Sequence, residues 1–471
     1  MRLKLSKKER VALVLVLAVY LCVAIFTGLH HEPWADEAQS WLISRDNNIF
    51  GIMQAVRYEG TLPFWYFILK FFQMFGLPYD YAFVVPMIFT TLGIILLFMT
   101  DAPFMCKLLI PFSFYVMYQE SVIARQYCLV FPALMLLVLT YRGRYSKPVR
   151  FFLSVFAVSI SSSYGFMIAC SFMLWEFICF IREHLGRAKA SEDNDRSHSR
   201  FRISFWITTA LLLITLIMSI PPDDCSFGVS AGKGFIFSFT ETFLFRVDST
   251  LKAVIFIITF LTATVLYFRK NILQVLVYAG PLVLYMALFY SRIWHLAYLF
   301  FLFVALMLIF KAEPTPDSKG AKKLLRAVPG IYFLILLIIQ CAAGFYASYL
   351  EYQKPYSPSK AVTEFVRPYI ESGAKADSLS YHPVSVQPYF DGNIFSNNPT
   401  DKSYYIWKEE YTYSELSSPE ADIIITPYDE FADPDDRYDM YGFHSFIVYK
   451  FCAFEDNCLS VYVKKDLQAS E

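Results

Sequence analysis

The sequence predicts a polytopic α-helical membrane protein with about 11 spans, interfacial helices and a small C-terminal α/β soluble domain. Three observations favour this class. The chain of 471 residues is 56% hydrophobic, its mean hydropathy is +0.43, and it contains a series of apolar runs long enough to cross a bilayer. The formal net charge is +0 at pH 7, which argues against nucleic acid as a partner.

The first element is an apolar run, Val11–Leu29, preceded by the basic segment MRLKLSKKER. This order is typical of a signal peptide, but no small-residue cleavage site follows Leu29. We therefore expect an uncleaved signal anchor that forms the first span.

Apolar runs of similar length recur along the chain. The expected crossings are Val11–Leu29, Tyr81–Thr100, Phe104–Tyr118, Val122–Thr140, Phe151–Ser162, Gly165–Ile181, Ile203–Ile220, Leu251–Phe268, Ile272–Tyr290, Ile293–Phe310 and Leu325–Tyr346. The two pieces on either side of SSSYG are short. One long tilted helix is the alternative there, and it would reverse the side assigned to every later loop.

The segment Leu62–Phe75 decides the topology. It has 14 residues, is rich in aromatic side chains and contains Lys70, which favours a helix lying in the interface over a crossing. With that choice, loops rich in Lys and Arg, such as Tyr141–Arg150 and Arg182–Arg202, all fall on the cytoplasmic side with the N-terminus. The C-terminal segment then lies outside the cytoplasm.

Composition divides the chain into a membrane domain, 1–347, and a soluble tail, 348–471, which is richer in Pro, Asp, Ser and Tyr. In the tail, ADIIITPYDEF indicates a buried strand, FIVYKFCAFEDNCLSVYVKK a hairpin and SPSKAVTEFVRPYIES a helix. The mixture predicts an α/β or α+β fold. Outside the cytoplasm, Cys452 and Cys458 could close a hairpin disulfide.

Chemically active side chains gather in the loops expected on the outer side. The first loop carries His30, His31, Glu32, Asp36, Glu37, Arg45, Asp46, Arg57 and Glu59, the second carries Glu120, Arg125 and Tyr127, and a later turn carries Arg292 and His295. A carboxylate can take a proton from an attacking hydroxyl, and an arginine can bind the phosphate of a leaving lipid phosphate. A divalent ion, Mg²⁺ or Mn²⁺, could occupy the acidic pair Asp36 and Glu37, because hard cations prefer oxygen ligands.

Each of these residues also has a structural interpretation. Asp36 and Glu37 suit the first turn of a helix formed by ADEAQSWLISRD, where acids are favourable. Arg125 suits a helix end from which its side chain reaches the interface. His30 and His31 suit a polar surface, since no third metal ligand follows at a motif spacing.

The stretches EPWADEAQSWLISRD, RYEGTLPFWY and PFSFYVMYQESVIARQY resemble bacterial membrane glycosyltransferases of the GT-C superfamily, in the branch of the protein O-mannosyltransferases and the aminoarabinose lipid A transferase. The likeness is strong over Leu29–Tyr141, weaker over the remaining spans and only architectural over the tail. Relatives usually read EGHPPLWY where this chain reads EGTLPFWY. Thr61 and Leu62 depart from that pattern, so no contact made by the missing His is carried over.

The resemblance implies a glycosyltransferase in the bacterial inner membrane that moves a sugar from a polyprenyl-phosphate donor to a lipid, glycan or protein acceptor outside the cytoplasm. It implies that Asp36 is the catalytic base and that Glu37 organises the site or a metal. Arg125, with Arg292 and His295, would bind the donor phosphate. The expected substrate-binding residues are His31, Arg57, Glu59, Glu120 and Tyr127.

Two other functions fit the same sequence. A transporter or flippase of lipid-linked saccharides would also use spans, outer charges and aromatic residues, but it favours internal repeats and charges near the bilayer centre, which are not evident here. A non-catalytic membrane scaffold would use Asp36 and Glu37 only as helix caps.

Overall fold

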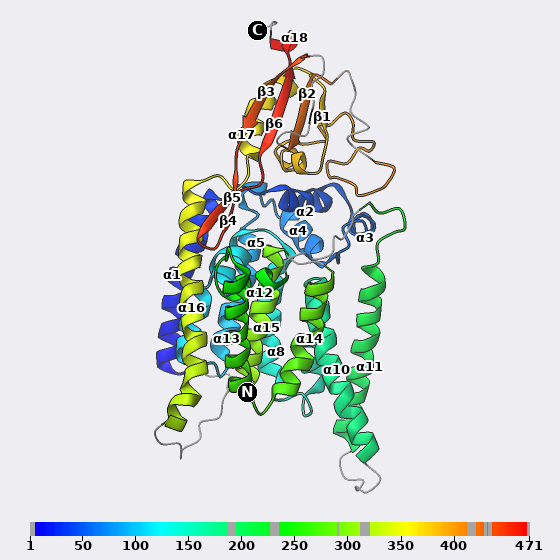
Figure 1. The fold of residues 1–471 in the computed structure, drawn as a ribbon. Coiled ribbons are helices and arrows are strands. Elements are labelled where there is room, and N and C mark those ends of the chain that lie inside the picture. The colour runs from blue at the N-terminus through cyan, green and yellow to red at the C-terminus, as the bar shows by residue number, and fades with distance from the viewer. Residues whose placement is uncertain are drawn as a thin grey trace.

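The computed structural model describes residues 5–186, 195–226, 235–289, 292–310, 321–411, 421–427, 431 and 436–468. Long helices form a bundle, and the tail stands on one end of it (Figure 1). The first helix begins at the end of the bundle opposite the tail. The helices are α1 (Lys7–His30), α2 (Ala35–Asp46), α3 (Ile49–Ala55), α4 (Phe64–Met74), α5 (Val84–Met99), α6 (Phe104–Leu109), α7 (Glu120–Val122), α8 (Val130–Tyr141), α9 (Pro148–Ser159), α10 (Ser163–Gly186), α11 (Asp195–Met218), α12 (Phe235–Phe243), α13 (Thr250–Phe268), α14 (Ile272–Leu288), α15 (Leu296–Ile309), α16 (Ala321–Gln353), α17 (Ser359–Glu371) and α18 (Lys465–Gln468).

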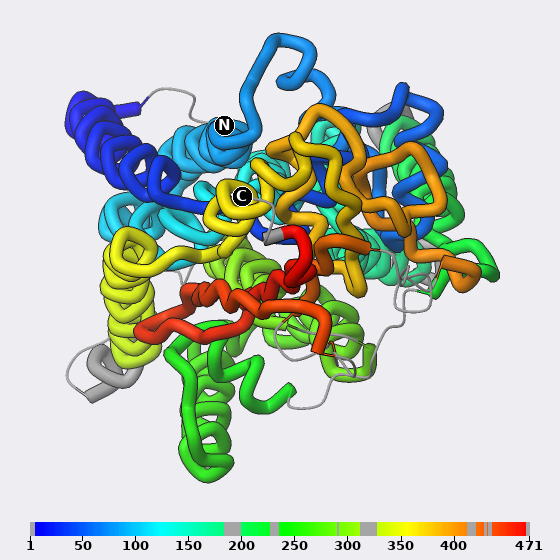
Figure 2. Tube along the Cα trace, turned by 90° about the horizontal axis from the view of Figure 1, so that it is seen from above, coloured from blue at the N-terminus to red at the C-terminus, as the bar shows by residue number. Residues whose placement is uncertain are grey.

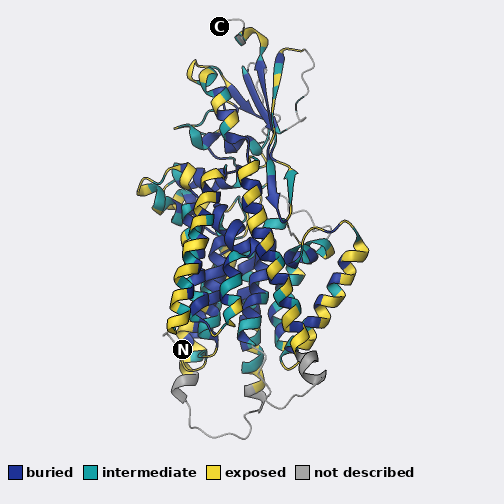
Figure 3. Cartoon of the chain, turned by 90° about the vertical axis from the view of Figure 1, so that its left-hand side faces the viewer, coloured by how far each residue is buried: buried dark blue, intermediate teal, exposed yellow. Residues whose placement is uncertain are grey.

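The protein is a membrane protein by the length and composition of its helices. Within the described residues, six helical segments are long and apolar enough to cross a bilayer: Lys7–His30, Tyr79–Met99, Ser163–Arg182, Ser199–Met218, Thr250–Phe268 and Ala327–Gln353. Shorter apolar helices at Gln126–Tyr141, Pro148–Ser159, Ile272–Leu288 and Ile293–Ile309 overlap further expected crossings. The crossing expected from Val122 becomes helical only at Gln126, because the chain is extended at Ile123 and Arg125. The outward faces of the long helices are apolar and exposed, for example at Leu213 and Ile217 of α11 and at Leu251 of α13 (Figure 3). Such faces suit contact with lipid rather than water.

The expectation of one continuous span over Phe104–Tyr118 is wrong. Helix α6 ends at Leu109, a 3₁₀ turn follows over Ile110–Phe112, Ser113 is extended, and a π-helical turn covers Phe114–Gln119. Pro111 lies inside the 3₁₀ turn, and its ring removes the backbone donor that a continuing α-helix needs. From Ile110 to Tyr118 all residues except Phe112 are buried, so the apolar character of this part reflects packing inside the bundle.

The break at SSSYG does separate two helices, as expected. Helix α9 ends at Ser159 and α10 begins at Ser163. The Ser162 hydroxyl oxygen accepts hydrogen bonds from the backbone N–H of Tyr164 (3.1 Å) and of Gly165 (3.3 Å), which satisfies donors at the start of α10. A side chain on Gly165 would lie 2.3 Å from the carbonyl oxygen of Val158, so the two helices meet through a glycine.

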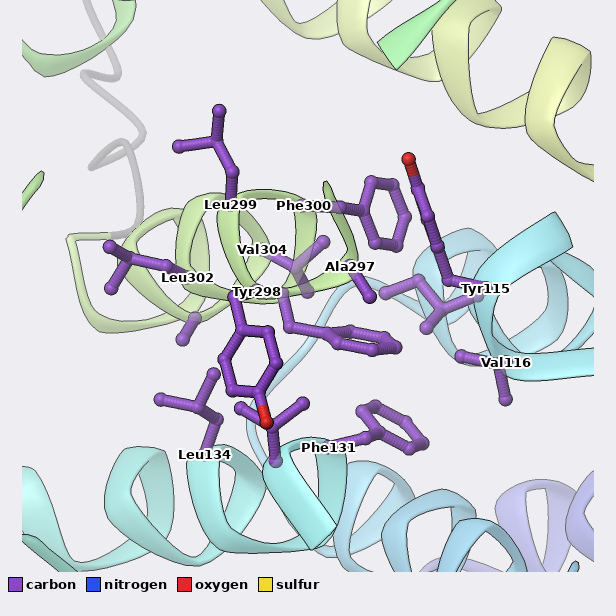
Figure 4. Close-up of a cluster of buried hydrophobic side chains, with 14 of the residues drawn as sticks. Tyr115, Val116, Phe131, Leu134, Ala297, Tyr298, Leu299, Phe300, Leu302 and Val304 are labelled. Carbon is purple, nitrogen blue, oxygen red and sulfur yellow. The ribbon is translucent and has the colours of Figure 1, made fainter. Parts of the chain in front are cut away.

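Helix α15 lies at the centre of the bundle core. Its buried face presents Ala297, Tyr298 and Phe300 toward Tyr115 and Phe131 (Figure 4). Phe131 also stacks on Phe301 of α15, with ring centroids 5.0 Å apart. These aromatic contacts join α8, α15 and the π-helical turn into one packed unit.

The tail contains the strands β1 (Ala376–Ser378), β2 (Ile423–Pro427), β3 (Tyr438–Phe443), β4 (Phe446–Tyr449), β5 (Cys452–Glu455) and β6 (Leu459–Lys464). A four-stranded mixed sheet has the order β1-β2-β6-β3, and β4 pairs with β5 in a separate hairpin. Helix α17 covers the large sheet with Val362 and Val366. The α/β fold and the buried strand at β2 agree with the sequence prediction, and α16 continues to Gln353, beyond the expected boundary at residue 347.

Two expectations for the tail need correction. The hairpin comprises β4 and β5, whereas β6 pairs with β2 and β3 in the large sheet. Cys452 and Cys458 are both free thiols. Cys452 begins β5, while the Cys458 Sγ lies near His444 and Glu455, so the two thiols belong to different surroundings.

The tail lies across one end of the bundle (Figure 2). The β4–β5 hairpin attaches it there. Lys450 at its turn is buried and donates to the Thr242 carbonyl oxygen (3.1 Å), to the Glu241 carbonyl oxygen and to the Tyr115 hydroxyl (3.0 Å). Glu241 and Thr242 occupy the last turn of α12, where carbonyl groups lack partners within the helix. The lysine therefore caps α12 from the tail.

Candidate functional site

Helix α2 lies between the end of the bundle and the tail (Figure 1). Gln39 makes two hydrogen bonds with the backbone of Tyr405, at 2.6 and 2.9 Å. Arg45 donates to the Ser403 hydroxyl (2.8 Å) and to the Phe390 carbonyl oxygen (2.9 Å). Tail contacts along the whole helix thus fix its position, and the helix coincides with the expected ADEAQSWLISRD.

Asp36 lies in the first turn of α2 and faces an arginine from a distant loop. Its Oδ2 is 3.0 Å from the Arg125 Nη1, and its Oδ1 accepts a hydrogen bond from the Tyr381 hydroxyl at 2.8 Å. Arg125 also donates to the Asp36 carbonyl oxygen at 2.9 Å. Each side chain of the ion pair exposes about a fifth of its surface, so the pair is accessible from a cavity.

That cavity has a volume of about 500 Å³ and lies between the bundle end and the tail. Six of the residues expected at the site line it: Asp36, Glu59, Arg125, Tyr127, Arg292 and His295. Aromatic side chains supply much of the remaining wall, namely Trp34, Trp65, Tyr66, Tyr164, Tyr285, Trp294, Tyr381 and Trp407. A carboxylate, two guanidinium groups and aromatic faces therefore share one hollow.

A chain of hydrogen bonds runs from Arg125 across the cavity wall. The Arg125 Nη2 donates to the Tyr127 hydroxyl at 3.4 Å, and that hydroxyl is 3.1 Å from the His295 Nε2. The other ring nitrogen of His295 lies 3.0 Å from the Tyr164 hydroxyl and accepts from the Arg292 backbone N–H at 3.2 Å. His295 thus links the start of α15 to the start of α10 and to Tyr127, next to the loop that carries Arg125.

Glu37, the neighbour of Asp36, faces away from the cavity into a buried cluster. Its Oε2 lies 2.9 Å from the His31 Nε2, and its Oε1 accepts from the Ala124 backbone N–H at 2.5 Å. The His31 Nδ1 lies 2.7 Å from Glu351 of α16, which accepts from the Tyr118 hydroxyl at 2.5 Å. Burial disfavours the imidazolium, but the carboxylates on both sides outweigh it and raise the pKa of His31 to about 10.

Glu59 is a second acid that lines the cavity. Its Oε1 accepts a hydrogen bond from Gln39 at 2.7 Å. Burial raises the pKa of Glu59 to about 7, against the opposing effects of Gln39 and Arg125. Thr61, which departs from the family pattern, also lines the cavity and donates to the Gln126 side chain at 2.7 Å.

Four residues expected to catalyse or bind substrate lie outside the cavity lining. Glu37 and His31 belong to the buried cluster, and Arg57 is exposed to solvent. Glu120 is buried, accepts a hydrogen bond from Gln119 at 3.3 Å, and has a pKa raised well above its usual range by burial. Successive positions on a helix point about 100° apart, so Asp36 and Glu37 face different partners and do not converge on one cation.

The tail contributes site residues that the sequence reading missed. Tyr381, His382, Trp407, Asp456 and Asn457 line the cavity, and Tyr381 bonds directly to Asp36. Ser162, Ser163 and Tyr164, from the start of α10, line it as well. The SSSYG break was a visible signal for that segment, whereas no motif marks the tail residues. The chain matches no protein-family model, and it has no significant match among curated proteins or solved structures.

Proposed function

We propose that this protein is a glycosyltransferase of the GT-C type, which moves a sugar from a polyprenyl-phosphate donor to a hydroxyl acceptor on the membrane face that carries the tail. One observation carries the proposal: Asp36 and Arg125 form an accessible ion pair in a cavity of about 500 Å³ that Arg292 also lines. A base and a site for a phosphate leaving group are the minimum that this reaction needs.

The ion pair suggests how a donor would engage. An incoming phosphate competes with the Asp36 carboxylate for the Arg125 guanidinium, which binds phosphate in a bidentate manner. Tyr381 keeps its hydrogen bond to Asp36 and orients the released carboxylate. The donor itself would thus uncover the base.

The proposed reaction balances with these groups. Asp36 takes the proton of the acceptor hydroxyl while the acceptor oxygen bonds to the anomeric carbon. The bond between that carbon and the phosphate oxygen breaks, and the lipid phosphate leaves with its electron pair. Arg125 and Arg292 stabilise the added negative charge on the phosphate. Inversion at the anomeric carbon is what a single displacement implies.

The cavity wall suits a sugar. Aromatic faces such as Trp407 and Tyr66 can pack against a pyranose ring, and polar groups such as Ser162 and Asn457 can bond to its hydroxyls. The cavity between the bundle end and the tail is lined by seven acidic, basic or histidine residues: Asp36, Glu59, Arg125, Arg292, His295, His382 and Asp456. Charges gathered there favour transfer at a surface over transport through the centre of the bundle. The extracytoplasmic orientation, the span count of about 11 and the bacterial inner membrane belong to this proposal.

Asp36→Asn tests it. The variant keeps the size of the side chain but cannot accept the proton, so we expect transfer from polyprenyl-phosphate-linked hexoses to fall by about 10²–10⁴-fold. Binding of polyprenyl phosphate should persist, because Arg125 and Arg292 are unchanged. Transfer would be measured with a panel of labelled donors in membranes that express the protein.

Asp80→Asn is the matched control. Asp80 is also an ion-paired carboxylate, with Lys360 at 3.2 Å, but it is half-exposed and lies outside the cavity lining. Transfer should be unchanged in this variant. Full transfer by Asp36→Asn, at the same level of folded protein, would remove Asp36 from the mechanism, and movement of donor across vesicles without transfer would favour a flippase.

A further inference from the structure

Three metal-ligating side chains meet on the tail, outside the cavity. His444 follows β3, Glu455 ends β5, and Cys458 precedes β6. The His444 Nδ1 lies 2.5 Å from the Glu455 Oε1, and the Cys458 Sγ lies 3.7 Å from the His444 Nδ1 and 3.5 Å from the Glu455 Oε1. Within the part of the chain that the structure describes, these residues form the one group of His, Cys and acidic side chains with metal-site spacing.

The spacing matches a particular coordination geometry. In a tetrahedral zinc site, with bonds of about 2.0–2.2 Å to N and O and about 2.3 Å to S, ligand atoms lie about 3.3–3.7 Å apart. Both distances from the sulfur already fall in or close to that range. The distance between His444 and Glu455 is shorter because those two groups are hydrogen-bonded, and a cation between them would replace that bond.

We propose that His444, Glu455 and Cys458 bind one Zn²⁺ ion. An imidazole, a carboxylate and a thiolate together select zinc over Mg²⁺ or Ca²⁺, which prefer oxygen ligands alone. The His444 and Glu455 side chains are half-exposed, so water can reach the fourth position. Binding releases the thiol proton of Cys458, because zinc takes cysteine as the thiolate.

The ion would act on the wall of the cavity. Two of its ligands, Glu455 and Cys458, flank Asp456 and Asn457, and both of these residues line the cavity. Asn457 is buried and donates to the Tyr356 carbonyl oxygen at 3.2 Å. Zinc would therefore close a short loop at both ends and hold this part of the wall in place. This inference is independent of the reaction that the cavity performs.

The test uses the full-length, untagged protein in detergent. The protein is stripped with EDTA, incubated with ZnCl₂ and freed of unbound metal by size exclusion, and its zinc is then measured by mass spectrometry. We expect about one zinc per chain. Cys458→Ser and His444→Ala should each weaken zinc binding at least tenfold, since each removes one ligand.

Cys452→Ser is the matched control, because Cys452 lies on the same hairpin but its Sγ faces the Lys450 carbonyl oxygen. This variant should keep its zinc. In the Cys452→Ser variant, bound zinc should slow the alkylation of Cys458 by maleimide. It should also slow hydrogen exchange at the Asn457 backbone amide, and EDTA should restore both rates. The proposal is overturned if the parent chain retains no more zinc than Cys458→Ser, or if peptide mapping finds Cys452 and Cys458 joined in a disulfide.

Discussion

At the scale of single residues, the buried cluster around His31 has the strictest electrostatic requirement. His31 lies between Glu37 and Glu351, and all three side chains are buried. Two buried carboxylates are tolerable only beside a cation. The protonated imidazole thus joins the start of α2 to the end of α16 and fixes the turn that presents Asp36.

Replacing His31 with Gln should therefore be strongly destabilising. The variant leaves two buried carboxylates without a counter-charge, and the expected loss is about 3–5 kcal/mol of unfolding free energy. Thermal unfolding in detergent measures it. His30→Gln, at the exposed neighbouring position, is the control and should stay within about 0.5 kcal/mol of the parent.

The same pair of proteins should differ in pH dependence. In the unfolded chain His31 loses its proton near its ordinary pKa of 6.5, whereas in the folded protein it does so near 10. The protonated His31 therefore makes its full contribution to the free energy of unfolding below pH 6.5, and this contribution is lost as the pH rises toward 10. The stability gap between the parent and His31→Gln should narrow across that window, and a gap of constant size would contradict the raised pKa.

Residue types and their position at a span boundary were enough to select Asp36, Arg125, Arg292 and His295, which the structure places in the lining of one cavity. They could not separate Asp36 from Glu37, because which of two adjacent acids faces the cavity depends on the rotation of α2 against the tail. The sequence also could not predict Tyr381 as a residue of the cavity, for a related reason. Its bond to Asp36 joins residues 345 positions apart, and no local pattern encodes such a contact.

At the scale of elements, helix packing depends on small residues at contact points. Gly93 of α5 faces Phe131 of α8, and a Cβ at this position would lie 2.3 Å from the Phe131 ring. The ring cannot retreat, because it is fully buried and stacked on Phe301. A glycine is therefore required where these two helices meet.

Gly93→Ala should destabilise the protein by about 1–3 kcal/mol, the usual cost of overpacking a core. Gly280→Ala in α14 is the matched control, since a Cβ there has nothing within 4 Å. It should be neutral or slightly stabilising, because alanine is the better helix former. The midpoints of thermal unfolding in detergent compare the two variants. Equal midpoints would contradict the prediction, because they would show that α5 and α8 can move apart to accommodate the added methyl group.

Elements with a clear period or length were predictable from the sequence, such as α1, α2, α13, α17 and β2. The segment Phe104–Tyr118 was not, because hydropathy counts apolar residues and does not register that Pro111 and the extended Ser113 interrupt the helix. Helix α12 was also missed. It is short, and part of its stability comes from Lys450 of the tail, more than 200 positions later in the chain.

At the scale of the whole molecule, charge and shape suggest one orientation. The basic loop Tyr141–Arg150 lies at the bundle end opposite the tail, and loops rich in Lys and Arg favour the cytoplasmic side. The tail and the cavity would then face the other compartment. Lipid-linked donors would reach the cavity from the membrane, and acceptors would reach it from water.

Cysteine labelling in intact cells tests this orientation. Ser372→Cys lies at the exposed end of α17 in the tail, and Ser146→Cys lies in the exposed turn between α8 and α9. A maleimide that cannot cross membranes should label the first variant above the parent chain and the second only after permeabilisation. The reverse pattern would place the cavity in the cytoplasm.

The partners of His31 are spread over most of the chain, since Glu351 follows it by 320 positions. A ribosome therefore delivers His31 and Glu37 to the membrane long before it makes Glu351 or the tail. Until synthesis passes that point, the His31–Glu37 pair lacks its second carboxylate, Glu351, and α2 lacks the tail that covers it. A nascent chain arrested before Glu351 should expose this unsatisfied segment to quality-control proteases, so the cell would discard truncated products early.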